Sequence, residues 1–314
     1  MSPGIRRTAQ PRQSRPGPAL ALAAGTAAAC AARAVYAALS RRPPGGAGTW
    51  TRTNHRGEQL TLLEGPALTA ASVAVSSVGP GLPGRVRAAL AVAGTGAAVL
   101  GGYDDLAGSG SRRGFRGHLG ALARGEITTG AVKLGGIGAT GLVSAALLGG
   151  SPADVAVNAG LVAGGANLLN LFDLRPGRAL KVALASGTLL ATRPSARLAV
   201  AAPLGAAAAL LPEDLGERAM LGDAGANALG ALLGVAAGAS LSRPARVTLL
   251  AVITGLTAAS EVVSFTAVIE RTPALRWLDM LGRRPIPAAP APGHDDAPPA
   301  GPREARTTAA AAPS

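Results

Sequence analysis

The feature that most constrains this chain is a series of apolar blocks, each about 14 to 25 residues long, separated by short polar or Pro/Gly-rich stretches. A water-soluble domain would have to bury nearly all of them at once, whereas a helix that crosses a bilayer needs about 20 apolar residues. Charged residues make up 15% of the chain, against about 25% in an ordinary soluble domain. The pattern therefore predicts an all-α fold, a polytopic membrane helix bundle with about nine transmembrane helices.

The predicted spans follow the apolar blocks and end at charged, proline or glycine residues. They cover residues 18–39, 66–79, 85–102, 131–149, 153–172, 178–192, 196–211, 224–241 and 245–269. We predict a disordered basic tail at 1–17, a membrane domain at 18–284 and a disordered Pro/Ala-rich tail at 285–314. The basic start also resembles the n-region of a signal peptide, but the length of the following block favours a first span.

The net charge of +13 raises the question of nucleic-acid binding. We exclude that function because the arginines lie between apolar blocks, without interleaved aromatic residues. Most basic residues fall in the loops after the first, third, fifth, seventh and ninth spans. The positive-inside rule then places these loops in the cytoplasm of a multi-pass plasma-membrane protein, although the basic N-terminal tail opposes this orientation. Cys30 is the only cysteine, which excludes an intramolecular disulfide and a metal site built from cysteines.

Four polar motifs fall at the predicted cytoplasmic ends of spans, and no outward loop has a comparable carboxylate motif. They are WTRTNHRGEQ (50–59), GGYDDLAGS (101–109), NLLNLFDL (167–174) and MLGDAGANALG (220–230). Asp104 and Asp105 are also typical of a solvated span end, and Asp223 of a helix N-cap. Asn170 and Asp173 share a helix face and are also typical of a capped helix end. The coincidence of all four motifs on one face favours a joint functional site.

These residue types suit a phosphorylated substrate held through Mg²⁺. Carboxylates hold the metal, arginine and lysine bind phosphate oxygens, and asparagine donates to a sugar or base. A site of this kind at a membrane surface favours one soluble phosphorylated donor and one lipid-borne acceptor.

The same motifs, in this order, resemble those of the polyprenyl-phosphate N-acetylhexosamine-1-phosphate transferase superfamily, which includes the phospho-MurNAc-pentapeptide translocase of peptidoglycan synthesis. The resemblance covers about residues 50–284. The family's DD pair is similar to GYDDLAG, its downstream lysine to Lys133 in VKLGG, and its G-D-x-G motif to GDAG. Its N-x-x-D-G-x-D-G pattern is matched by Asn170, Asp173 and Gly177, and EVVSFTAVIERTPALRWLDMLGRRP resembles its C-terminal span and loop.

The resemblance implies a Mg²⁺-dependent transferase that moves a sugar-1-phosphate from a UDP-sugar to undecaprenyl phosphate at the cytoplasmic face and releases UMP. Such enzymes serve cell-envelope polysaccharide or peptidoglycan synthesis and often form homodimers. The implied catalytic residues are Asp104, as the base, Asp105 and Asp173, and the implied metal ligands are Asp223 and Asp105. The predicted substrate-binding residues are Asn54, Arg56, Lys133, Asn170, Arg175 and Arg178.

The chain departs from the family at Pro176, which stands where the family has a second aspartate. The family's histidine-rich loop and final span are replaced by PIPAAPAPG and the tail that follows. His55 and His118 lie in predicted cytoplasmic loops, either as substitutes for the missing histidines or as plain loop residues. Two functions stay open: an active transferase with an altered donor, and a non-catalytic relative that binds lipid phosphate as a partner subunit. A transporter is disfavoured because the acids lie at span ends.

Overall fold

The structure is a computed structural model, and it describes residues 17–54, 56–107 and 129–285. His55 and His118 lie outside the described residues, as do the two predicted tails apart from Gly17 and Pro285. The sequence-based predictions for these parts of the chain therefore stay predictions.

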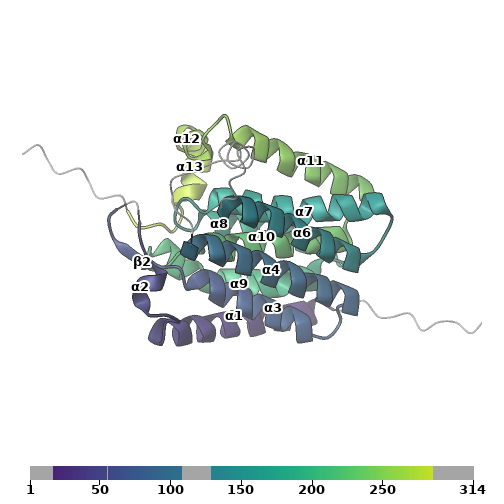
Figure 1. Cartoon of the computed structure of the whole chain (residues 1–314), viewed down its shortest axis with the longest axis horizontal. Coiled ribbons are helices and arrows are strands. Elements are labelled where there is room, and N and C mark those ends of the chain that lie inside the picture. Colours follow the sequence, from purple (N-terminus) through teal and green to yellow (C-terminus); the bar gives the residue numbers. More distant parts are fainter. Residues whose placement is uncertain (1–16, 55, 108–128, 286–314) are drawn as a thin grey trace, which may run out of the picture. The chain divides into compact units, whose positions relative to one another are not determined.

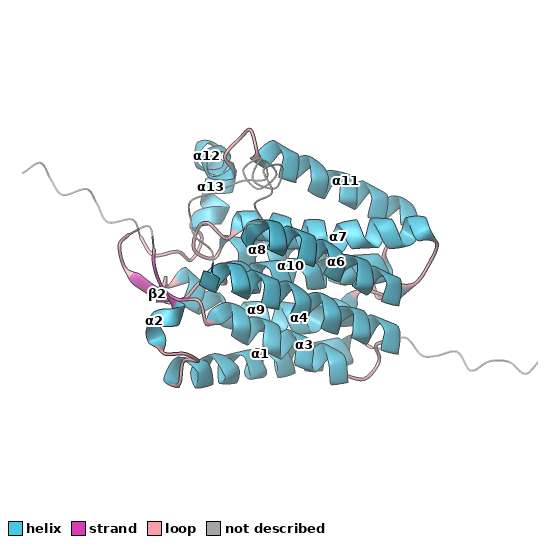
Figure 2. Ribbon diagram, viewed as in Figure 1, coloured by secondary structure: helices cyan, strands magenta, loops and turns pink. Residues whose placement is uncertain are grey.

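Helices make up most of the described residues, as Figure 1 and Figure 2 show. The helices are α1 (Pro18–Arg41), α2 (Ala47–Trp50), α3 (Glu64–Val78), α4 (Gly84–Ala107), α6 (Thr129–Leu148), α7 (Pro152–Phe172), α8 (Arg178–Ala191), α9 (Arg197–Leu215), α10 (Gly222–Ser240), α11 (Arg243–Ser260), α12 (Phe265–Arg271) and α13 (Pro273–Met280). Two short strands, β1 (Thr51–Thr53) and β2 (Gln59–Thr61), pair antiparallel. The all-α prediction is therefore confirmed apart from this one small hairpin, which lies within the predicted 50–59 motif and just beyond it.

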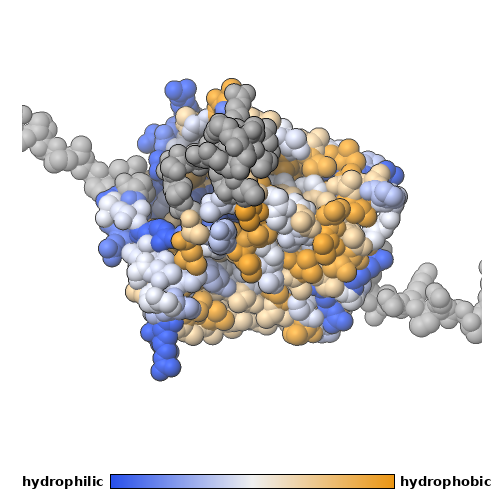
Figure 3. Space-filling model, viewed as in Figure 1, coloured by the Kyte–Doolittle hydropathy of each residue, from blue (hydrophilic) through white to orange (hydrophobic). Residues whose placement is uncertain are grey.

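Five helices are long and apolar enough to cross a membrane within the described residues, namely α1, α4, α6, α7 and α9. A sixth follows if α11 and α12 together count as one broken span. Figure 3 shows apolar residues over the flanks of the helices and hydrophilic residues near the helix ends. These features confirm a helical bundle of membrane type. The number nine stays a prediction, because α3 and α8 have only 15 and 14 residues.

The predicted span 245–269 is wrong as a single helix. Helix α11 ends at Ser260, and α12 follows at an angle of 93°. The new helix begins after Ser264, whose side chain accepts a hydrogen bond of 3.4 Å from the Ala267 N–H. A serine N-cap is a strong start signal for a helix, and it lies here inside an apolar block that suggested continuity.

Helix α10 occupies the centre of the bundle and packs against α3, α4 and α7. Its sequence, GDAGANALGALLGVAAGAS, is mostly alanine, glycine and leucine, and 14 of its 19 residues are buried. A side-chain carbon at Gly230 would lie 2.6 Å from the carbonyl carbon of Gly165 on α7, so the two backbones are in direct contact. Small residues permit such close approach between membrane helices, where dispersion contacts supply the attraction. The close contact between the backbones of α10 and α7 therefore sets the position of α10 in the bundle.

Candidate functional site

The four predicted motifs meet at one end of the bundle, which we call the motif end. Helices α4 and α7 finish there, and α6, α8 and α10 begin there. The hairpin and α12 and α13 lie at the same end, on the left of Figure 1. The structure thus brings together the polar segments that the sequence placed at span ends.

Lys133 lies between two of the predicted carboxylates. Its ammonium is 3.2 Å from Asp104 Oδ2, and it donates a hydrogen bond to Asp223 Oδ2. The Thr129 hydroxyl adds a hydrogen bond to Asp104. The exposed fractions of the side chains are 13% for Lys133, 21% for Asp104 and 24% for Asp223, so the group is mostly shielded from solvent. Three helices therefore contribute to one cluster of alternating charge.

Asp105 binds the beginning of α10. Its Oδ1 accepts a hydrogen bond of 3.0 Å from the Asp223 N–H, and its Oδ2 accepts one of 2.9 Å from the Ala224 N–H. These N–H groups have no partner within the helix, and the helix dipole also favours a negative charge there. The Arg52 guanidinium donates to the Asp105 carbonyl. Asp105 thus positions Asp223 at the start of α10.

Gly222 allows this close approach. Its φ of +61° lies in the left-handed region that favours glycine, and a Cβ there would lie 2.9 Å from Asp105 Oδ2. The Gly222 N–H also interacts with the Asp173 carboxylate at the end of α7. Asp173 is buried, with 7% exposure. The first turn of α10 therefore lies against carboxylates from two different helices, α4 and α7.

Two buried acids next to Asp173 were not predicted from the sequence. Glu64 and Asp214 both interact electrostatically with Asp173, and their exposures are 0% and 2%. Neither carboxylate oxygen of Glu64 has a hydrogen-bond partner among the described residues. The signal was present, because Glu64 lies just before the predicted span 66–79 and Asp214 just after 196–211. Acids beside apolar blocks are rare unless they have a role.

Asn54 and Arg56 both contact Glu217, in the loop between α9 and α10. The Asn54 amide donates to Glu217 Oε2 over 2.9 Å, and Arg56 Nε donates to Oε1 over 3.0 Å. At the hairpin, Arg284 donates two hydrogen bonds of 2.6 and 3.0 Å to Glu58, and this holds the pKa of that carboxyl below its ordinary value. The contacts tie the hairpin to the bundle, and substrate binding by Asn54 and Arg56 stays a prediction.

Asn170 and Arg175 are the predicted residues that remain open to a ligand. Both are partly exposed at the motif end, next to Asp173. In the part of the chain that the structure describes, neither side chain has a hydrogen bond or ion pair. An amide and a guanidinium in this state are suited to binding a polar substrate.

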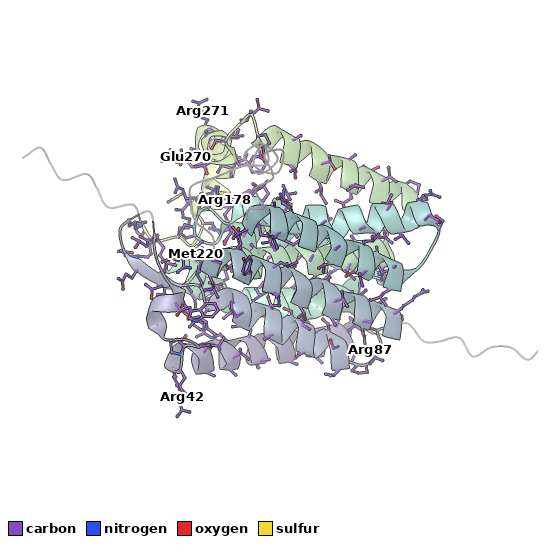
Figure 4. All side chains as sticks on the ribbon, in the orientation of Figure 1. Arg42, Arg87, Arg178, Met220, Glu270 and Arg271 are labelled. Carbon is purple, nitrogen blue, oxygen red and sulfur yellow. The ribbon has the colours of Figure 1, made fainter. Side chains whose placement is uncertain are left out.

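Arg178 instead lies in a buried ion pair that joins α8 to α13. Its Nε and Nη2 donate to the two carboxylate oxygens of Asp279 over 2.7 and 3.2 Å, and its exposure is 4%. Figure 4 shows Arg178 between the bundle and α12 and α13. Burial raises the pKa of Asp279, but Arg178, Arg283 and Lys181 together bring it below its ordinary value. Lys181 donates to the carbonyls at the end of α13.

Replacing Arg178 with methionine is expected to lower the free energy of unfolding by about 3 kcal/mol, because Asp279 would keep a buried charge with one partner fewer. Thermal unfolding in detergent, together with protease protection of the α12–α13 segment, measures the effect. Arg175→Met is the matched control, since Arg175 is only three residues away. A further change of Asp279 to leucine should restore part of the loss. Equal unfolding temperatures for Arg178→Met and Arg175→Met would contradict the structural role of the pair.

The carboxylates of the motif end fit Mg²⁺ of the kind that is shared with a substrate. Within the described ranges, no group of three His, Cys, Asp or Glu side chains is arranged to hold a metal ion. Mg²⁺ is commonly bound by one or two carboxylates together with substrate phosphates and waters, rather than by a complete protein cage. The Lys133 ammonium between Asp104 and Asp223 demonstrates that this pair already stabilises a positive charge.

No protein-family model matches this chain, and no curated protein is significantly similar to it in sequence.

Proposed function

We propose that the protein is an integral membrane transferase that moves a sugar-1-phosphate from a UDP-sugar to a polyprenyl phosphate, such as undecaprenyl phosphate, and releases UMP. The observation that supports this function best is the cluster of Asp104, Lys133 and Asp223, held by Asp105 at the start of α10. It combines carboxylates for a metal with a cation for phosphate, next to apolar helices that suit a lipid acceptor.

In the proposed reaction, an oxygen of the lipid phosphate attacks the phosphorus that carries the sugar. The new P–O bond forms a lipid diphosphate sugar, and the bond to UMP breaks, so that UMP leaves with its own phosphate. Asp104 takes the proton of the lipid phosphate. Such phosphoryl transfers depend mainly on positioning and on stabilisation of charge.

Asp223 and the outer lone pairs of Asp105 are the proposed ligands of Mg²⁺. When bound, the ion neutralises the diphosphate and stabilises the UMP leaving group. Lys133, whose ammonium is paired with Asp104 and Asp223, is the proposed cation for a phosphate oxygen. Asn170 and Arg175 are the proposed donor-binding residues, since both side chains are open beside Asp173.

We place this site at the cytoplasmic face of the plasma membrane, because nucleotide sugars are soluble and the motif-end loops carry most of the basic residues. The proposed pathway is cell-envelope polysaccharide or peptidoglycan synthesis, and the expected assembly is a homodimer. No nucleic acid is involved in this proposal.

The second candidate is a non-catalytic relative that binds lipid phosphate as a subunit in envelope assembly. Pro176, in place of a second aspartate, favours it, as do the protein contacts of Asn54, Arg56 and Arg178. Asn54, Arg56 and Arg178 are predicted to bind the nucleotide sugar, and here their side chains are engaged by other residues of the protein.

One assay separates the two candidates. Purified protein in detergent is given undecaprenyl phosphate, Mg²⁺ and a panel of UDP-sugars, and the release of UMP is followed. We expect release with at least one donor and its loss when EDTA removes Mg²⁺. Failure with every donor, while lipid phosphate still binds, would favour the non-catalytic relative.

A further inference from the structure

The end of the bundle away from the motifs, which we call the opposite end, contains a polar cavity of about 350 Å³. It lies where α4, α7 and α11 begin and where α10 ends. Its polar side chains are Arg85, Asp154, Asn158 and Arg246. None of the four motifs contributes to its lining, so the cavity is separate from the candidate transferase site. The opposite end is on the right of Figure 4, where Arg87 is labelled.

Arg246 is fixed in this cavity from one side. Its Nη1 donates to Asn158 Oδ1 and its Nη2 to Asp154 Oδ1, each over 2.8 Å. The side chain is 12% exposed, and its Nε–H is buried with no acceptor among the described residues. A buried N–H of a charged group is costly when it has no partner. The guanidinium is therefore oriented by the protein, and each of its Nη groups carries a second N–H beyond the one used for Asn158 or Asp154.

The oxygens of Asp154 are not free to bind a cation. Its Oδ2 accepts hydrogen bonds from the Ser151 N–H (3.1 Å) and hydroxyl (2.6 Å), and its Oδ1 accepts from Arg246. Asn158 is 2% exposed, and its Oδ1 is taken by Arg246. The side-chain amide N–H groups of Asn158 are then the part of this residue that can still form a hydrogen bond with a ligand. Among the polar side chains of the lining, the groups left for a ligand are consequently donors.

Arg85 adds a second positive charge from the first turn of α4. It lines the cavity, and within the described residues its side chain makes no hydrogen bond or ion pair. Arg85 and Arg246 together outweigh the single charge of Asp154. Arg243, whose Nε is 3.8 Å from Asp154, increases the excess of positive charge nearby. A bound anion would compensate this excess of positive charge.

The volume and the residue type indicate which anion fits. A water molecule takes about 30 Å³ of liquid volume, so the cavity has room for a tetrahedral oxyanion with several ordered waters. Guanidinium groups bind phosphate oxygens through planar pairs of N–H donors. We propose that this cavity binds a phosphate oxyanion between Arg85 and Arg246. The site is independent of the proposed transfer reaction.

Two sources of this chemistry are compatible with the position of the cavity. Membrane lipid headgroups lie at the level of helix ends in a spanning bundle, and free phosphate reaches the same depth from water. The shared requirement is a phosphate oxygen on Arg85 and Arg246, and the test uses one probe for each source.

The test compares the full-length protein with Arg85→Gln and with Arg87→Gln. The first variant keeps the contacts of Arg246 with Asp154 and Asn158 intact, and the second removes a nearby arginine of the same helix that does not line the cavity. Each protein, in neutral detergent, is titrated with inorganic phosphate at constant ionic strength set by potassium chloride. A second titration uses phosphatidylglycerol in mixed micelles. The rise in unfolding temperature, relative to each protein without ligand, gives the midpoint concentration.

We expect at least one probe to stabilise the wild-type protein in a saturable way, and Arg85→Gln to need about tenfold more of it. Arg87→Gln should behave as the wild type does. An effect of inorganic phosphate alone would identify a free anion, and an effect of phosphatidylglycerol alone a lipid headgroup. The proposal is overturned if neither probe stabilises the wild type, or if Arg85→Gln and Arg87→Gln have equal midpoints.

Discussion

The Asp223→Asn variant is expected to release UMP roughly 100- to 1,000-fold more slowly than the wild-type protein, because it removes the charge that both Lys133 and the proposed Mg²⁺ require. The amide has nearly the same shape as the carboxylate. The backbone N–H of residue 223 would still donate to Asp105, so the start of α10 should keep its place. The rate of UMP release at saturating Mg²⁺ measures the effect.

Glu270→Gln is the control for this variant. Glu270 is an exposed carboxylate on α12 at the motif end, and it is labelled in Figure 4. Its rate should equal that of the wild type. If Asp223→Asn kept full activity with an unchanged requirement for Mg²⁺, Asp223 would not be a metal ligand and the proposed arrangement of the site would be wrong.

Replacing Gly101 with alanine is expected to reduce activity by about 100-fold, through a displacement of α10 rather than the loss of a reacting group. A Cβ on Gly101 would lie 2.8 Å from the Ala224 nitrogen and closer still to the Asp223 carbonyl. All of these neighbours are backbone atoms, so the helices α4 and α10 must separate to make room. We also expect the free energy of unfolding to fall by about 1 to 3 kcal/mol.

Gly102 provides the matched control, because it is the next residue of the same helix. A Cβ at Gly102 would meet only the Ala224 side chain, at an ordinary contact distance of 3.7 Å. Gly102→Ala should therefore keep both activity and stability close to those of the wild type. Parallel measurements of UMP release and thermal unfolding test the pair. Equal activities for the two alanine variants would contradict the view that contact between α4 and α10 positions Asp223.

The helices were largely predictable because each corresponds to one apolar block with start and stop signals close by in the sequence. The prediction of 153–172 differs from α7 by one residue, since Ser151 and Pro152 form a clear start signal. Two features were not visible in this way. The turn after Ser260 is hidden within an apolar block, and each hairpin strand has three residues, too few for an alternating pattern.

The candidate site was predictable only in part. The joint placement of Asp104, Lys133 and Asp223 followed from their positions at span ends. The partner of Arg178 did not, because Asp279 is 101 residues further along the chain and lies beyond the last predicted span. A sequence motif indicates which charges exist, whereas burial and pairing decide which of them remain available to a ligand.

The central position of α10 has a consequence for genetics. Asp223 is its one ionisable residue, yet its alanines and glycines face neighbouring helices with little room for larger side chains. A survey of random substitutions along this helix would record inactive variants at chemically inert positions as often as at the carboxylate. Loss of function there would report helix spacing, and only exchanges that preserve size, such as Asp to Asn, would identify the residue that takes part in the chemistry.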